Sequence, residues 1–292
     1  MRPIRASVRR DQQTPERIVR RAAVVLLLIV TAAILAPWLA PYDPAAQLDI
    51  VQLKNGAPSL SHWLGTDPYS RDVFSRAVFG ARTSLTVAAL ATVLATVVGC
   101  AWGACAASVN ESLGDGLMSV VDVMRSLPRV LVFLGVAVLL GPLSAVTLAL
   151  VLGTTAWTGT SRLVYVLVRE ITARPFVEAA RAMGASRWRL MQRHVMPQLL
   201  TPVVASGALL LADLLAVEAG LSFIGLGVRP PGSSWGSMLQ DGLPYLRSAW
   251  WLAAVPSVLL IATVLSAAGI ADRLGQASGR RASRAAGSSA SS

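Results

Sequence analysis

Charged residues are scarce in this chain, at 14% of its 292 residues, whereas about 25% is usual for a soluble globular protein. Hydrophobic residues make up 54%, so the composition indicates a protein that lies in lipid. Basic residues outnumber acidic ones by 26 to 15, but they lie between long apolar runs. A membrane surface therefore accounts for the excess positive charge better than a nucleic acid does.

Cysteine, histidine and lysine are also few, and their positions exclude several kinds of site. Cys100 and Cys105 lie in one apolar stretch, and His62 and His194 are far apart, so no zinc-binding spacing occurs. No G-x-x-x-x-G-K-[ST] loop is present, and the single lysine, Lys54, stands in a polar stretch. We expect no catalytic residues, no metal, no cofactor and no nucleotide site in this chain.

Long apolar runs predict six membrane crossings, because a helix needs roughly 20 residues to span about 30 Å of hydrocarbon. The basic stretch 1–21 resembles the start of a signal peptide, but no convincing cleavage site follows it, which favours an uncleaved anchor. The fold class is therefore an all-α integral membrane protein. The expected spans are residues 22–40, 84–109, 117–140, 143–168, 199–219 and 249–271.

The second and third spans differ in character. Many Gly, Ala and Thr residues in 84–109 predict a helix inside the bundle, because small residues let helices approach closely in lipid. The first half of the third run contains residues that interrupt its apolar character, namely Asp122, Arg125, Pro128 and Arg129. This half must therefore be cytoplasmic or buried in protein. A local ion pair between Asp122 and Arg125 is the simpler interpretation, and contact with the translocation path is the alternative.

Orientation follows from the distribution of arginine. Six crossings place the basic stretches 1–21, 170–198 and 273–292 on one side, and the polar loop 41–82 with few basic residues on the other. Both termini are therefore expected in the cytoplasm. The tail 273–292, rich in Ser, Ala, Gly and Arg, is predicted to be disordered.

The stretch 170–198 is too polar to cross the membrane, yet its apolar residues recur at helical spacing. Gly184 is placed to end a first helix, Ser186 to cap a second, and Pro197 to break the pattern before the next span. An amphipathic pair that only rests on lipid headgroups is one interpretation. The two apolar stripes are Phe176, Ala180 and Met183, then Trp188, Met191 and Val195.

The order Glu178-Ala-Ala, three residues, Gly184 and then Pro197 resembles the EAA loop of ABC importer permeases. That resemblance implies a type I importer permease fold, with a short cytoplasmic coupling helix at about 176–190 that sits in a groove of a separate ATP-hydrolysing subunit. This chain itself would then not be an enzyme. The residues assigned to ATPase coupling are Phe176, Glu178, Ala179, Ala180, Gly184, Ala185 and Pro197.

Two more segments resemble the dipeptide, oligopeptide and nickel permease group. Residues 62–72 look like its external segment, and residues 218–236 look like its signature after the fifth span, within a permease core at 83–272. The chain is similar to the second permease subunit of that group, which has an extra amino-terminal segment. The external-loop residues singled out are Gly65, Thr66, Asp67, Arg71 and Asp72.

Acidic residues of the external loop and of the spans have different expected roles. Asp67, Arg71 and Asp72 are expected to pair and cap turns, with direct solute contact as the alternative. Asp213 and Glu218 lie in an apolar span, where a carboxylate is costly and usually faces a cavity or partner. Together with Asp122 they are candidates for pathway or gating roles.

The resemblance implies a permease subunit that imports di- or oligopeptides by alternating access across a bacterial inner membrane. Expected partners are a second permease subunit, two ATP-binding subunits, an extracytoplasmic solute-binding protein and membrane lipid, with no nucleic acid. A nickel or other small-solute importer of the same group is an alternative. Two alternatives come from other classes of protein. One is a secondary transporter, and the other is an intramembrane enzyme that uses Asp122, Asp213 or Glu218 as acid and base.

Overall fold

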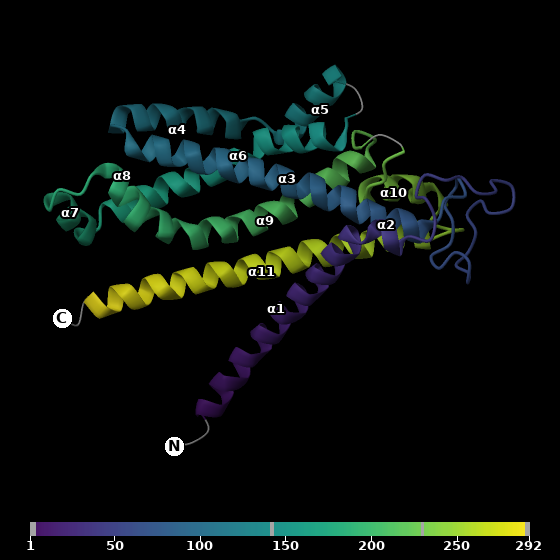
Figure 1. The fold of residues 1–292 in the computed structure, drawn as a ribbon, viewed down its shortest axis with the longest axis horizontal. Helices are drawn as coiled ribbons and strands as arrows, with labels where there is room; N and C mark the ends of the chain where they lie inside the picture. The colour runs from purple at the N-terminus through teal and green to yellow at the C-terminus, as the bar shows by residue number, and fades with distance from the viewer. Residues whose placement is uncertain (1–3, 141–142, 229–230, 290–292) are drawn as a thin grey trace. The chain divides into compact units, whose positions relative to one another are not determined.

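The computed structural model describes residues 4–140, 143–228 and 231–289, and in them the regular structure is helical (Figure 1). Pairing of extended backbone there is limited to the isolated bridges Thr66–Asp72 and Leu143–Val228. The predicted all-α class is confirmed. The helices are α1 (Ile4–Ile34), α2 (Ala36–Leu39), α3 (Val73–Ser108), α4 (Glu111–Ser126), α5 (Arg129–Leu140), α6 (Ala145–Thr172), α7 (Pro175–Ala182), α8 (Arg187–Leu190), the π-helix η1 (Met191–Val195), α9 (Met196–Phe223), α10 (Trp235–Gly242), the 3-10 helix η2 (Leu243–Tyr245) and α11 (Trp251–Ser289).

The chain divides into two compact units. The first unit comprises residues 1–90, 134–149 and 211–270, and the second comprises residues 91–133, 150–210 and 271–292. Because α3, α6, α9 and α11 each contain a division point, both units are built from parts of the same long helices. The first unit contains the stretch 41–82, which we call the external loop after its predicted location, and the second contains the stretch 170–198.

Three helical runs among the described residues are long and apolar enough to cross a membrane. They are α3, the run Trp188–Phe223 formed by most of α8 with η1 and α9, and Trp251–Gln276 of α11. These coincide with the second, fifth and sixth expected spans. The count of six crossings stays a prediction.

The third expected span is not one continuous helix. α4 ends at Ser126, Leu127 is extended (φ −80°, ψ 128°), and α5 then runs for 12 residues. Pro128 explains the break, because a proline disfavours helical backbone at the residue before it and has no N–H to donate. At 1.5 Å per residue α5 covers roughly 18 Å, less than the hydrocarbon core.

Two expected boundaries at the ends of the chain also shift. α1 begins at Ile4, inside the predicted basic tail, and Pro37 stands in the first turn of the short α2 that follows. α11 continues to Ser289, so the backbone of residues 273–289 is helical where disorder was predicted. Alanine, arginine and glutamine in that stretch are good helix formers, which favours continuation of the helix.

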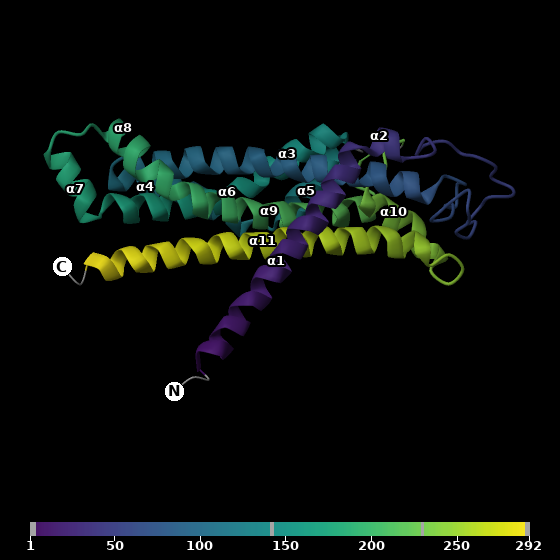
Figure 2. The ribbon, with the colours of Figure 1, turned by 60° about the horizontal axis from the view of Figure 1, so that its bottom comes forward.

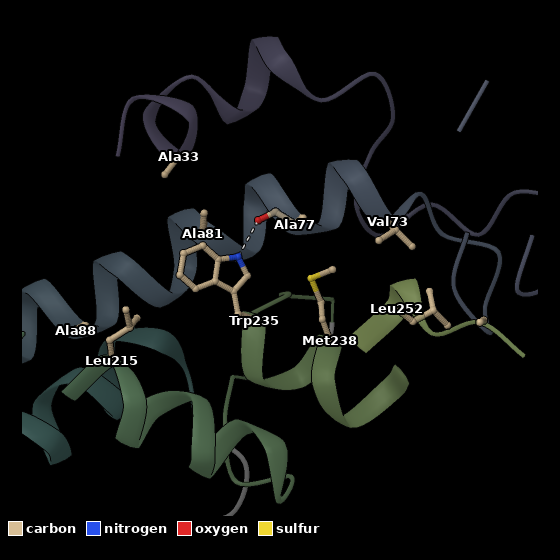
Figure 3. Close-up of a cluster of buried hydrophobic side chains, with 10 residues drawn as sticks. Ala33, Val73, Ala77, Ala81, Ala88, Leu215, Trp235, Met238 and Leu252 are labelled. Carbon is tan, nitrogen blue, oxygen red and sulfur yellow. Dashed lines mark hydrogen bonds between the residues drawn. The ribbon is translucent and has the colours of Figure 1, made fainter. Parts of the chain in front are cut away.

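Trp235 at the start of α10 occupies the centre of the first unit's core (Figure 3). Its indole is fully buried against α3, where Ala77 and Ala81 leave room for the ring, and Met238 lies beside it. The indole Nε1 donates a hydrogen bond to the carbonyl oxygen of Ala77 at 3.1 Å. A buried tryptophan needs such a partner for its N–H, so this bond fixes the start of α10 on α3.

Small residues bring α3 close to α6 in the second unit. A Cβ atom added to Gly99 would lie 2.6 Å from the carbonyl oxygen of Trp157, and one added to Gly103 would lie 3.0 Å from the Cβ atom of Val164. Neither position admits a side chain without a shift of backbone. The prediction that 84–109 forms a helix of the bundle interior is therefore confirmed for this part of it.

Candidate functional site

The stretch 170–198 forms two short helices joined by a turn (Figures 1 and 2). Pro175 begins α7, at the position where a missing backbone N–H costs nothing. Gly184 follows the end of α7 with φ +87°, and a Cβ atom there would meet nothing within 4 Å. Glycine is thus needed for the left-handed backbone and not for space, and the predicted helix end at Gly184 is confirmed.

The second helix starts as predicted but does not stop where predicted. The Ser186 hydroxyl accepts the backbone N–H of Arg189 at 3.3 Å, which caps α8. Helical backbone then continues through the π-helix Met191–Val195 into α9, so Pro197 lies in the first turn of α9 and does not break the helix. The wider π turn just before Pro197 accommodates the ring and the missing N–H.

The buried face of the stretch differs from the apolar stripes read in the sequence. Val177, Leu190 and Val195 are buried. In contrast, Met183 is 82% exposed, Trp188 69% and Phe176 44%. Large apolar side chains that remain exposed on one short segment are typical of a surface that contacts another protein or lipid. We call Phe176, Met183 and Trp188 the exposed apolar set.

Arg174 ties both ends of the stretch together. Its guanidinium donates to Glu170 Oε1 of α6 at 2.8 Å and to Gln198 Oε1 of α9 at 3.0 Å. Glu178 and Ala179 on α7 are exposed, and Glu178 makes no ion pair with another described residue. The base of the segment is therefore held to two long helices, while its outer surface stays available.

Asp122 does not form the predicted local pair with Arg125. Its carboxylate accepts a hydrogen bond from Nη2 of Arg162, which lies on α6. Both side chains are about half exposed, so solvent screens the pair and its contribution to stability is small. The pair links α4 to α6 within the second unit.

The external loop of the first unit is organised around Asp67, which is only 2% exposed. Its Oδ1 accepts the backbone N–H groups of Tyr69 and Arg71 at 2.8 and 2.9 Å. Its Oδ2 accepts Nε of Arg71 at 2.7 Å and Nη1 of Arg76. The predicted pairing and turn-capping role of Asp67 and Arg71 is confirmed.

Asp72 holds the start of α3 in the same loop. Its Oδ2 accepts the backbone N–H and the hydroxyl of Ser75, each at 2.8 Å, and its Oδ1 lies 3.0 Å from Nδ1 of His62. The Thr66 hydroxyl donates to the carbonyl oxygen of Leu53. Gly65 has φ +74°, and a Cβ atom there would clash with the backbone of Gly56.

Asp241 of α10 is a member of this network that the sequence did not reveal. Arg71 Nη2 and Arg76 Nη1 bind its Oδ2 at 2.9 and 3.0 Å. Arg71 and Asp241 are 170 positions apart, and no local pattern marks such a pair. Two arginines between two carboxylates therefore fasten the external loop to α10.

Asp213 and Glu218 lie in different surroundings on α9. Glu218 is fully buried, and its Oε1 accepts the hydroxyl of Ser222 at 2.7 Å. Asp213 is exposed. Five helical residues separate the two by about 140° around the axis, so they do not form one acidic site.

Comparisons with known proteins show which family the chain belongs to. The family described as "Binding-protein-dependent transport system inner membrane component" matches residues 95–281, and the "N-terminal TM domain of oligopeptide transport permease C" matches residues 21–58. A putative peptide transport system permease protein of Brucella suis is 34% identical over 89% of this chain and 88% of its own length. The dipeptide transport system permease protein DppC of Bacillus subtilis is 33% identical over 80% of this chain and 72% of its own length.

A solved structure has the same fold at lower sequence identity. The MetNI methionine ABC transporter in an inward-facing conformation matches with a TM-score of 0.54 and 19% identity. The match covers 68% of this chain and 94% of that one. At this identity the likeness concerns the fold alone.

Proposed function

Because this chain belongs to the family of binding-protein-dependent transport system inner membrane components and is a multi-pass permease subunit of an ABC importer, we propose that its cargo is a di- or oligopeptide. Support comes from relatives named as peptide or dipeptide permeases, 31 to 36% identical over most of the chain. A nickel chelate or another small solute is the alternative cargo. Uptake measurements decide between them.

The observation that carries the mechanism is the exposed apolar set on a segment whose base is held by Arg174. Exposed Phe176, Met183 and Trp188 are suited to a hydrophobic groove on an ATP-binding subunit. Glu178 adds a carboxylate for a charge-assisted hydrogen bond with that subunit. The stretch 170–198 is then the coupling segment, and Ala179, Ala180 and Ala185 allow its close approach.

Arg174 gives the coupling segment a route to the transmembrane helices. Its hydrogen bonds join Glu170 of α6 and Gln198 of α9, so a displacement of the segment is passed to two helices. In the proposed cycle, ATP binding closes two ATP-binding subunits, the coupling segments follow, and two permease subunits rock to open the path outward. Both termini and the coupling segment lie on the cytoplasmic side.

The external loop has a matching role on the other side of the membrane. Its ion-pair network, built on Asp67 and Asp241, keeps it in one conformation. A rigid loop is a suitable platform for an extracytoplasmic solute-binding protein, because little conformational entropy is lost on docking. The network residues act on loop structure and not on the solute.

Reconstitution tests the proposal directly. The chain, a second permease and two ATP-binding subunits are placed in proteoliposomes with the solute-binding protein, and entry of a labelled dipeptide is measured with and without ATP. We expect ATP-dependent uptake that is lost in Gly184→Trp, since a residue with a Cβ atom disfavours the left-handed backbone at φ +87° and so alters the turn of the coupling segment. Gly116→Trp, at an exposed glycine of α4 that also has open space around it, is the matched control.

Other outcomes would point elsewhere. Uptake by the chain without ATP-binding subunits would indicate a secondary transporter and contradict the proposal. ATP-dependent uptake of nickel but not of peptide would contradict the cargo alone. An intramembrane enzyme is disfavoured because Glu218 has no exposed surface and Asp213 lies on another face of α9.

A further inference from the structure

Arg82 is an exposed arginine on the membrane-spanning helix α3, and the proposed function assigns it no role. Its guanidinium forms no hydrogen bond or ion pair with another described residue. In contrast, Arg76 on the same helix is 3% exposed and binds Asp67 and Asp241. Six helical positions correspond to about 240° around the axis, so Arg82 lies on another face of α3 than the ion-pair network of the external loop.

The position of Arg82 along α3 is close to the expected edge of the hydrocarbon. α3 has 36 residues and is therefore about 54 Å long, whereas the hydrocarbon core is about 30 Å thick. If α3 extends equally on both sides, about 12 Å of it projects at each end, and Arg82 lies about 14 Å after Val73. The long side chain of an arginine at this depth reaches the phosphates of the lipid headgroups.

Arg82 also lines an apolar groove of about 360 Å³ between α1, α3 and α9 in the first unit. Among the described residues that line the groove none is acidic, and Thr86 has the only other polar side chain. The groove is thus suited to a hydrocarbon chain and offers almost nothing to a peptide backbone, whose polar groups need partners. Its aliphatic wall includes Leu26, Val30 and Ile34 of α1 and Ala89 of α3.

The groove extends inward from the level of Arg82. Within the first unit, α1 and the start of α3 run in opposite directions (Figures 1 and 2). Ala33 near the end of α1 packs in one buried cluster with Ala81 of α3 (Figure 3). From there the wall continues to Leu26 along α1 and to Ala89 along α3, in each case about 10 Å deeper. The two walls agree in length, so the groove leads from the headgroup level toward the middle of the membrane.

We propose that this groove binds a phospholipid of the outer leaflet, with its phosphodiester group on Arg82 and one acyl chain between α1 and α3. The guanidinium presents N–H donors in a planar fork, which suits bidentate binding of a phosphate. The acyl chain supplies the contacts that the aliphatic walls lack in the empty groove. This inference rests on the proposed function, which places this end of α3 on the external side.

Photocrosslinking in a membrane tests the site. The full importer complex is placed in proteoliposomes that contain a phosphatidylglycerol with a diazirine in the middle of one acyl chain. A second preparation contains a diacylglycerol with the same photoreactive chain and no phosphate. After illumination, mass spectrometry measures the fraction of the α1 peptide with Leu26 that carries a lipid adduct.

We expect about tenfold more adduct with phosphatidylglycerol than with diacylglycerol, the effect of one hydrogen bond to a charged group. Arg82→Gln should remove this difference. Arg82→Lys keeps the charge but not the planar fork, so it should reduce the difference only in part. Arg247→Gln is the matched control, because Arg247 is an exposed arginine of the first unit that does not line the groove. It should keep the full difference.

A second pair of variants tests the place of the acyl chain while Arg82 stays intact. Ala89→Phe puts a ring into the groove and should abolish the adduct on the α1 peptide. Leu90→Phe changes the neighbouring residue, which is 49% exposed and does not line the groove, and it should keep the adduct. This pair also decides the matter if Arg82→Gln does not assemble.

Equal adduct with the two lipids would overturn the proposal, as would a difference that survives Arg82→Gln. Crosslinks from a photoreactive residue at position 89 to the second permease subunit would also overturn it, because a protein helix would then fill the groove. Failure of the proposed function is recognised separately, by the absence of ATP-dependent uptake in the same proteoliposomes, and the lipid adduct does not enter that measurement.

Discussion

The external loop and the coupling segment use the same residue types in opposite ways. In the loop, charged side chains are buried and bonded to each other, with Asp67 at the centre of two arginines. In the coupling segment, charged side chains are exposed and large apolar ones are exposed as well, including Met183 and Trp188. Polar groups determine the conformation of the loop, whereas Met183 and Trp188 of the segment remain largely exposed among the described residues.

Under the proposed function, this contrast gives the two regions different ways of meeting their partners. A buried network over-determines one conformation, so the loop offers a fixed surface. A segment held at its base by Arg174 and apolar outside can follow a partner that moves. Substitutions in the loop should therefore mainly change stability, and those in the coupling segment should mainly change assembly and coupling.

The largest expected loss of stability is that of Asp67→Ala in the external loop. It leaves Arg71 and Arg76 with one carboxylate, Asp241, in a buried position, and breaking a buried pair typically costs about 3–5 kcal/mol. The free energy of unfolding in detergent measures the loss. Asp43→Ala removes an exposed aspartate that caps a turn, and an equal loss in that control would contradict the central role of Asp67.

Each region contains a glycine with positive φ, so the cost of replacing it can be compared directly between the two regions. Gly184→Ala should cost about 1–2 kcal/mol, the cost of a left-handed backbone for an L-residue, because its surroundings are open. Gly65→Ala should cost more, since its Cβ atom also clashes with Gly56 and lies 2.8 Å from Nε1 of Trp251. Thermal unfolding of the two variants gives the order, and the reverse order would sink this explanation.

A pair of substitutions within the coupling segment separates docking from folding. Trp188→Ala should leave the free energy of unfolding within about 0.5 kcal/mol but weaken binding of the ATP-binding subunits by about tenfold or more. Val177→Ala removes a buried side chain and should lower stability instead. Pull-down affinity and unfolding measured on both variants check this, and a destabilised Trp188→Ala would refute the exposed position of the ring.

The stability effect expected for Arg174→Ala is also small, below about 1 kcal/mol, because its partners Glu170 and Gln198 are exposed. Its functional effect should be larger, with less peptide imported per ATP hydrolysed. Arg169→Ala, which breaks a similarly exposed pair with Glu111, should keep the ratio. An unchanged ratio in Arg174→Ala would remove Arg174 from the coupling route.

Local patterns in the sequence predicted local structure well. Gly184, Ser186 and the aspartates of the external loop were placed correctly because their roles depend on residues within a few positions. The break at Pro128 and the continuous helix at Pro197 show the limit of such reasoning. One proline ends a helix and the other is accommodated by a π turn, and only the surrounding packing decides between them.

Contacts between distant parts of the chain could not be predicted in this way. Asp122 pairs with Arg162 across 40 positions and not with Arg125, and Asp241 joins a loop 170 positions away. The buried face of the coupling segment was also not predictable, because apolar residues lie on more than one side of α7. Val177 is buried there while Met183 is exposed, and helical spacing alone does not show which side is buried.

Crosslinking from the two regions tests the central claim most directly. A photoreactive residue is placed at Met183 of the coupling segment, 82% exposed, or at Val51 of the external loop, 93% exposed, in the assembled importer. The account predicts an adduct with the ATP-binding subunit from position 183 and none from position 51. Adducts with that subunit from position 51, or from neither position, would contradict the assignment of residues 170–198 as the coupling segment.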